Sequence, residues 1–169
     1  MWVYGEYWND DGERSDIGAL VSAAKDDDDP RAAIELARRV GEWATTLEIP
    51  RDPIVTAVPP NPAKPDHLAA TLAAAVATAL GTPLVLDLIA RRFATDRLRD
   101  TPIADRPAMA DAAGYVVDDV ALGRNVVLLD DVVLTGTTVD HLAHRLRGAG
   151  AASVTVLVGA RTRVRNRPE

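Results

Sequence analysis

The sequence contains no cysteine and few lysines or aromatic residues. The absence of cysteine excludes disulfide bonds and metal sites with thiolate ligands. Aromatic residues make up 4% of the chain, and its tryptophans are too far apart in the sequence to predict a base-stacking platform. Among the 19 basic residues only Lys25 and Lys64 are lysines. We therefore expect each of the two either to act in a site or to lie on an exposed loop.

The sequence also lacks a long apolar run and an excess of positive charge. Its first 16 residues, MWVYGEYWNDDGERSD, carry acids where a signal peptide needs an apolar core, and no later run reaches membrane-spanning length. These absences predict a soluble, cytoplasmic protein with no membrane partner. The net charge of −6 argues against a nucleic-acid partner, which needs a broad basic surface. The basic cluster at residues 161–167 is interpreted as a solvated end of the chain.

The length and composition indicate one domain. A chain of 169 residues that is 47% hydrophobic can bury a full core. We expect residues 1–52 to form an edge strand and helices, residues 53–160 to form the core, and residues 161–169 to form a basic tail. Strand-like segments alternate with helix-like ones, which predicts a three-layer α/β fold with a mainly parallel central sheet and helices on both faces. The predicted core strands are Ile54–Val58, Leu84–Leu88, Val126–Asp130 and Val154–Val158.

The flanking segments predict further elements. Residues 1–8 mix aromatic and β-branched residues and predict an edge strand, and residues 115–117 predict a further strand. Helices are expected at 16–25, from Pro30, at 68–80 and at 139–146. The apolar face of the helix from Pro30 is assigned to Ile34, Leu36, Ala37, Val40, Trp43 and Ala44. The four consecutive acids at 26–29 are interpreted as a solvated turn, because calcium loops place their carboxylates at alternate positions.

The most informative stretch is 125–138, NVVLLDDVVLTGTT, where an apolar strand runs into two acids and a Thr/Gly turn. The small residues of this turn allow a close approach of backbone N–H groups to an anion at the start of the next helix. Asp130 and Asp131 would repel a phosphate unless hydroxyl groups or a cation lie between them, which favours a ribose with hydrated Mg²⁺. A Walker A loop is excluded, because no Gly-Lys-Ser/Thr follows the strand. An ordinary capped helix after an acidic turn remains the alternative.

This stretch resembles the 5-phosphoribosyl 1-pyrophosphate (PRPP) motif of type I phosphoribosyltransferases. The resemblance implies the corresponding fold, with a flexible lid, and implies Mg²⁺ as the cofactor. It assigns Asp130 and Asp131 to catalysis, to the ribose and to the metal. It also assigns the 5′-phosphate to the loop of Leu134, Thr135, Gly136, Thr137 and Thr138.

The pyrophosphate is assigned to two other segments by the same resemblance. The loop after the strand at 54–58, PPNPAKP, is in the position where the family binds pyrophosphate through backbone amides. Its prolines lack N–H donors, so Asn61, Ala63 and Lys64 must contribute more, and a cis X-Pro bond there stays open. The arginine-rich segment 90–109 has no sustained period and is interpreted as the lid. Its candidate pyrophosphate ligands are Arg91 and Arg92, with Arg97, Arg99 and Arg106 as further candidates.

Within this superfamily the chain is most similar to the ComF-like, competence-associated branch. The similarity rests on the segment 20–25 ending in lysine, the Val-Pro-Pro loop, and the stretches 114–117 and 146–162. The cysteine-rich zinc-binding start of that branch is missing, and Pro65-Asp66-His67-Leu68-Ala69 replaces a stretch often found after its first loop. The resemblance implies an enzyme that transfers phosphoribose from PRPP to an unidentified nucleophile, such as a nucleobase, and releases pyrophosphate. A non-catalytic module that senses PRPP or a nucleotide is the alternative, and the chain could form a homo-oligomer.

Overall fold

The computed structural model describes residues 1–63, 67–94, 102 and 105–163. Its main sheet contains β1 (Trp2–Glu6), β2 (Ile54–Ala57), β5 (Asn125–Val133) and β6 (Ser153–Arg161). The strand order is β1-β6-β5-β2, and all neighbouring strands are parallel. The predicted edge strand at the N-terminus is therefore confirmed. A second, two-stranded antiparallel sheet pairs β3 (Ile89–Arg91) with β4 (Tyr115–Val117), which confirms the strand expected at 115–117.

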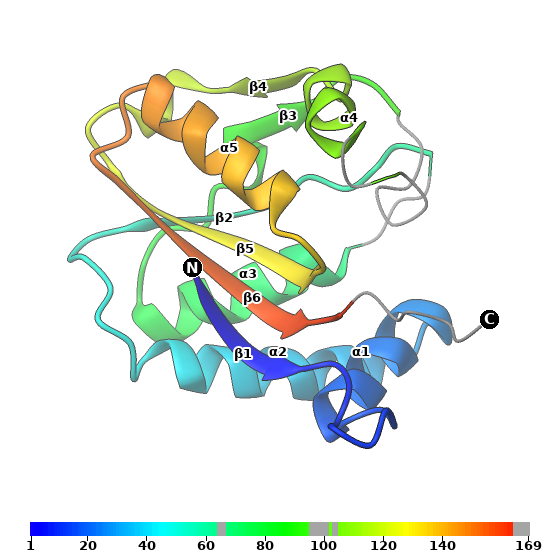
Figure 1. The fold of residues 1–169 in the computed structure, drawn as a ribbon. Helices are drawn as coiled ribbons and strands as arrows, with labels where there is room; N and C mark the ends of the chain where they lie inside the picture. The colour runs from blue at the N-terminus through cyan, green and yellow to red at the C-terminus, as the bar shows by residue number, and fades with distance from the viewer. Residues whose placement is uncertain (64–66, 95–101, 103–104, 164–169) are drawn as a thin grey trace.

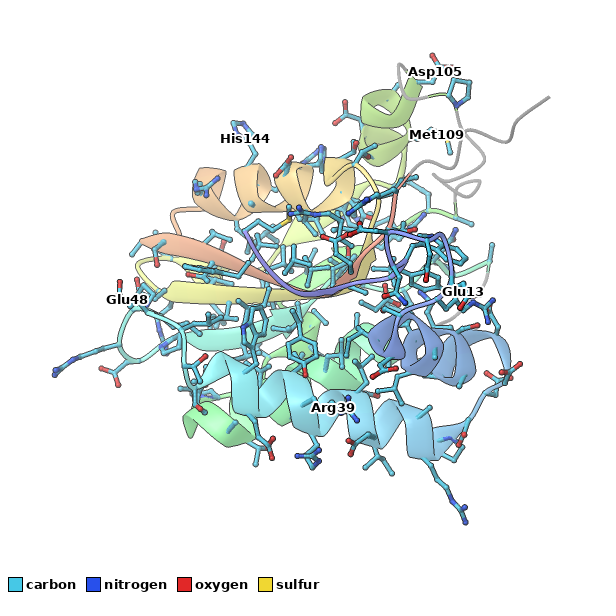
Figure 2. All side chains as sticks on the ribbon, turned by 60° about the horizontal axis from the view of Figure 1, so that its bottom comes forward. Glu13, Arg39, Glu48, Asp105, Met109 and His144 are labelled. Carbon is cyan, nitrogen blue, oxygen red and sulfur yellow. The ribbon has the colours of Figure 1, made fainter. Side chains whose placement is uncertain are left out.

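Helices cover both faces of the main sheet, as the sequence predicts (Figure 1). α1 (Asp16–Asp26), α2 (Pro30–Ala44) and α3 (Leu68–Leu80) lie on one face. α5 (Thr137–Gly148) lies on the other face, together with α4 (Arg106–Ala112) and the small sheet. Figure 2 shows Arg39 of α2 and His144 of α5 on the outer sides of these two layers. None of the described helices is both long and apolar enough to cross a membrane.

The central strands divide the core into two clusters because their side chains alternate between the faces of the sheet. In β5, Val127 and Leu129 pack with α2 and α3 in the first cluster. Val126 and Leu128 pack with α5 and β4 in the second cluster. These four residues are at most 1% exposed, which explains why β5 appears in the sequence as an unbroken apolar run.

The predicted strand at Leu84–Leu88 is wrong. Leu84 forms only an isolated parallel bridge with Val55, and Leu86–Leu88 is a turn of 3₁₀-helix. Pro83 has no N–H with which to continue the ladder on one side. On the other side the chain turns to bury Leu88 in the second cluster before it enters β3. An apolar run of this length does not distinguish a strand from a turn that buries one of its residues.

The apolar face assigned to α2 is correct except at Ile34. Leu36, Ala37, Val40 and Ala44 are buried, whereas Ile34 is 66% exposed. Two residues of α-helix turn by about 200°, so Ile34 projects away from the side on which Leu36 is buried. Of the four acids predicted to form a turn, Asp26 ends α1 and the other three connect α1 to α2. The Asp29 carboxylate caps α2 by accepting a hydrogen bond from the N–H of Arg31.

The arginine-rich segment 90–109 is more regular at its ends than predicted. Its first residues belong to β3, and Arg106 begins α4. Residues 95–101 and 103–104, which make up nearly half of the predicted lid, lie outside the described residues. Arg161, the first residue of the predicted basic tail, instead belongs to β6 and pairs with Glu6 and Val133. Residues 164–169 of this tail lie outside the described residues.

Candidate functional site

The Thr/Gly loop joins the carboxyl end of β5 to the start of α5. Gly136 adopts a left-handed backbone conformation, with φ of 83°, and provides no side chain to cap the helix. The hydroxyl oxygens of Thr135 and Thr137 lie 2.9 Å apart. The first N–H groups of α5 and these hydroxyls therefore lie at one small turn, where the helix dipole favours a negatively charged ligand.

The two acids precede this loop but do not end the strand, in contrast to the prediction. β5 continues through Asp130 and Asp131 to Val133 and remains paired with β6. The alternation of its side chains is interrupted at the acids, since Val132 packs with the first cluster and Val133 with the second. Gly159 of β6 lies opposite this irregularity, where an added Cβ would be 2.9 Å from the carbonyl oxygen of Asp131.

Asp131 forms an ion pair with Lys25 of α1. The lysine Nζ donates a hydrogen bond to Oδ2 of Asp131, and the other carboxylate oxygen accepts one from the N–H of Val132 at 2.6 Å. Asp131 is a buried residue, 8% exposed, and the Lys25 side chain is 29% exposed. The sequence left Lys25 between a functional and a surface role, and the structure brings it to the acidic pair.

Asp130 has an unusual electrostatic environment. Burial, followed by the charge of the neighbouring Asp131 carboxylate, raises the pKa of Asp130 from 3.8 to about 8. The Lys25 ammonium and the N–H of Asp131, which donates to Oδ1 of Asp130 at 3.0 Å, oppose this rise. The Asp130 carboxyl therefore has few cationic partners among the described residues. Such a group is suited to bind a ligand that carries hydroxyl groups or a cation.

The loop and Asp130 line one side of a pocket of about 610 Å³. The lining from this side is Asp130 together with residues 132–139. The opposite wall comes from the N-terminal part of the chain and from the end of β6. It consists of Tyr7, Trp8, Val21, Ser22, Lys25, Asp26, Thr162 and Arg163. This pocket is large enough for a small phosphorylated ligand.

The wall around Trp8 was not predicted from the sequence. The indole N–H of Trp8 donates a hydrogen bond to the Thr162 hydroxyl at 3.0 Å, and the Trp8 ring meets the edge of Tyr7 at 4.9 Å between centroids. The N–H of Thr162 in turn donates to the carbonyl of Val133 at 2.8 Å. The only indication of this wall in the sequence was the aromatic cluster at residues 2–8. That cluster predicted packing, but it did not predict that these residues lie beside a pocket.

None of the described residues predicted for pyrophosphate lines this pocket. Asn61 is half-buried and Ala63 is exposed, and the Ala63 N–H donates to the Asn61 side-chain oxygen at 3.2 Å. No cis peptide bond occurs among the described residues, so the cis X-Pro bond left open for this loop is absent from its described part. Lys64 lies outside the described residues. Arg91 donates from Nε to the carbonyl of Phe93 at 3.1 Å, and Arg92 is exposed. The pyrophosphate roles of these residues stay predictions.

The donor atoms of the acidic pair determine how well it fits Mg²⁺. Carboxylate oxygens are the hard ligands that Mg²⁺ prefers, but Lys25 already engages one oxygen of Asp131. The described residues contain no group of three or more His, Cys, Asp or Glu side chains that could enclose a metal ion. The pair therefore fits an ion that takes its remaining ligands from substrate phosphates and water.

Comparisons with known proteins identify the fold. No protein-family model matches the chain, and no curated protein is significantly similar in sequence. The solved structure of the allosteric regulatory enzyme of purine biosynthesis is similar, with 24% identity and a TM-score of 0.51. Glutamine phosphoribosylpyrophosphate (PRPP) amidotransferase from B. subtilis, complexed with ADP and GMP, is also similar, with 21% identity and a TM-score of 0.52. Each match covers 75% of this chain but only 26% of the other, so the chain corresponds to about a quarter of these proteins. These likenesses confirm the predicted type I phosphoribosyltransferase-like fold class.

Proposed function

We propose that the protein binds PRPP together with Mg²⁺ and transfers its phosphoribosyl group to a nucleophile, with release of pyrophosphate. The observation that carries the proposal is the pocket in which Asp130 and the Thr/Gly loop line the same wall. A loop that suits a phosphate and an acid, Asp130, whose side chain is close to the same pocket are the two features needed for a phosphorylated sugar with free hydroxyls. The fold supports this proposal, because one of the similar structures is named for its use of PRPP.

In this proposal each group has a separate task. The N–H groups at the start of α5 and the hydroxyls of Thr135, Thr137 and Thr138 bind the 5′-phosphate. Asp130 accepts hydrogen bonds from the ribose hydroxyls, with Asp131 beside it. Mg²⁺, when bound, neutralises negative charge on the pyrophosphate and so makes it a better leaving group. The pyrophosphate ligands proposed for this chain are Asn61, Ala63 and Lys64 of the first loop with Arg91 and Arg92.

The transfer itself exchanges one bond for another at the anomeric carbon. The bond from this carbon to the pyrophosphate oxygen breaks, the bond to the nucleophile forms, and the nucleophile releases its proton. Groups of the chain act by positioning the sugar and by excluding water from the positive charge that develops on the ribose. The nucleophile is not defined by the residues, and assignment to the ComF-like branch stays a prediction.

A sensor that binds PRPP or a nucleotide without catalysis is the second candidate. One observation favours it specifically. The Ala63 N–H, which pyrophosphate binding by an enzyme would require, already donates to the Asn61 side-chain oxygen. Pro59, Pro60 and Pro62 of the same loop have no N–H to offer. A sensor would keep the phosphate loop and the sugar site while lacking an effective site for the leaving group.

Calorimetric titration of PRPP, with and without Mg²⁺, tests the binding step. We expect binding to be stronger with Mg²⁺ and to be lost in Thr137→Asp, because a negative charge about 4 Å from the phosphate costs about 4 kcal/mol per charge pair at an effective dielectric constant of 20. Thr78→Asp is the matched control, since it adds the same charge at an exposed position of α3 that does not line the pocket. Absence of PRPP binding by the unmodified protein would refute both candidate functions.

Pyrophosphate release then separates the enzyme from the sensor. The unmodified protein, with PRPP and Mg²⁺ at saturation, is screened against nucleobases and small amines. The transferase is supported if any acceptor gives pyrophosphate release and this release disappears in Asp131→Asn. The variant must keep its unfolding temperature within a few degrees of that of the unmodified protein. PRPP binding with no release across the panel supports the sensor.

A further inference from the structure

The contact between Lys25 and Asp131 joins residues that are 106 positions apart and belong to different layers of the fold. α1 presents Lys25 from its last turn. The helix is fixed at its start by the Ser15 hydroxyl, which accepts a hydrogen bond from the N–H of Gly18 at 2.9 Å. It is fixed further by Gly18 itself, which packs directly against the carbonyl of Tyr7. The lysine therefore reaches Asp131 from an anchored helix, and the ion pair is part of the fold.

The position of this ammonium has a consequence for the charge of the site. Two adjacent acids beside a pocket offer oxygen ligands to a divalent cation, which would displace the proton of Asp130, and a third acid, Asp26, lines the same pocket. Lys25 engages Oδ2 of Asp131, while the other oxygen of Asp131 accepts the N–H of Val132. Both oxygens of the more buried acid are thus engaged, and one positive charge is fixed next to the pair. A metal ion that brings no other ligands would have to displace the Lys25 ammonium or bind close to its positive charge.

We propose that Lys25 is an internal counter-ion that keeps bare divalent metal out of the acidic pair, so that the metal enters only with the phosphates of the ligand. This regulation of the site rests on the proposed function, in which Mg²⁺ and PRPP bind together. Lys25 is a positioning residue in this scheme. It holds the Asp131 carboxylate in place and leaves Asp130 for the sugar.

The test measures metal binding to the ligand-free protein. Mn²⁺ serves as a paramagnetic probe for Mg²⁺, and electron paramagnetic resonance counts the ions that remain free. We expect the unmodified protein and Lys25→Arg to bind Mn²⁺ weakly, and Lys25→Met to bind about one equivalent at least tenfold more tightly. Asp131→Asn in the Lys25→Met background should remove this gain. Arg38→Met is the matched control, because it removes a cation that binds two carboxylates on the exposed face of α2.

A thermal unfolding series gives a second readout that does not depend on activity. Lys25→Met leaves the buried Asp131 carboxylate without its ammonium, so the variant should unfold at a lower temperature than the unmodified protein. Mg²⁺ alone should restore part of the loss in Lys25→Met and should leave the unmodified protein unchanged. Lys25→Gln, which keeps a hydrogen-bond donor, repeats the measurement if the methionine variant does not fold.

Two results would overturn the role of Lys25. One is tight Mn²⁺ binding by the ligand-free, unmodified protein, and the other is equal Mn²⁺ affinity in Lys25→Met and the unmodified protein. Neither depends on PRPP, so failure of the proposed function appears separately, as an absence of PRPP binding in calorimetry. Addition of PRPP to the unmodified protein should raise its Mn²⁺ affinity at least tenfold, which links the two proposals.

Discussion

Gly136 is the residue of the Thr/Gly loop at which a small change tests the proposed phosphate site. Its φ of 83° lies in the left-handed region, and an added Cβ would meet no heavy atom closer than the Asp140 carboxylate oxygen at 3.4 Å. Gly136→Ala therefore tests backbone strain with little steric clash. Gly81 is a matched control, because it caps α3 with φ of 65° and a Cβ there would meet nothing within 4 Å.

The expected magnitudes differ for stability and for binding. An alanine held in the left-handed region costs about 1–2 kcal/mol. For a chain of this length that corresponds to a fall in unfolding temperature of roughly 2–8 °C in either variant. If the loop of Gly136→Ala relaxes to relieve the strain, the N–H groups at the start of α5 turn away from the phosphate. A lost hydrogen bond to a charged group is worth about 1.5–3 kcal/mol, or a tenfold or greater loss of PRPP affinity.

Calorimetry and thermal unfolding of the two variants separate a loss of PRPP affinity from a loss of stability. We expect both to lose similar stability, whereas only Gly136→Ala loses PRPP affinity. Unchanged PRPP affinity in Gly136→Ala, together with the expected loss of stability, would refute the assignment of this loop to the phosphate. An equal loss of affinity in Gly81→Ala would show that the effect reflects general destabilisation.

Two further predictions concern stability. In Gly18→Ala the Cβ would lie 2.0 Å from the carbonyl oxygen of Tyr7, so we expect a loss of about 1–3 kcal/mol in denaturant unfolding despite the better helix propensity of alanine. Gly148→Ala, with nothing within 4 Å of its Cβ, should be neutral or stabilising, and a similar loss in both would contradict the packing argument. The second concerns pH. The pKa of Asp130 is raised to about 8 by burial and by Asp131, so the folded chain keeps a proton that the unfolded chain releases above about pH 4. The contribution of Asp130 to stability is therefore fully present below about pH 4 and is lost as the pH rises to about 8. The unfolding temperature of the ligand-free protein should fall from about pH 5 to about pH 8, and a fall of the same size in Asp130→Asn would contradict this origin.

Local patterns in the sequence were sufficient to predict the elements at the centre of the fold. The apolar run before Asp130 predicted a buried parallel strand, and its four residues are buried in β5. The alanine-rich segment Leu68–Leu80 forms α3 with the predicted bounds, because its apolar periodicity and Gly81 at its end are local signals. The Thr/Gly loop leads from β5 into α5 as expected, since strand, turn and helix are all specified within 25 residues.

The sequence was less informative where tertiary packing determines the local structure. Leu84–Leu88 has the composition of a strand, but Pro83 and the burial of Leu88 turn it into a bridge and a 3₁₀ turn. Ile34 is apolar yet lies on the solvent side of α2, so hydrophobicity alone assigned it to the wrong face. The partner of Lys25 lies 106 residues away, and that of Trp8 lies 154 residues away. Contacts between residues so far apart produce no local periodicity in the sequence from which they could be predicted.

The pairing of β1 with β6 implies an order of assembly. β1 is made before the other strands of the main sheet, but its only partner strand among the described residues, β6, is the last of these strands along the chain. Contacts between such distant segments close large loops and form slowly. The sheet of β2, β5 and β6 can therefore form before β1 docks, and the wall that carries Trp8 would be completed last. A folding intermediate of this kind would contain the Thr/Gly loop while the pocket was still open on one side.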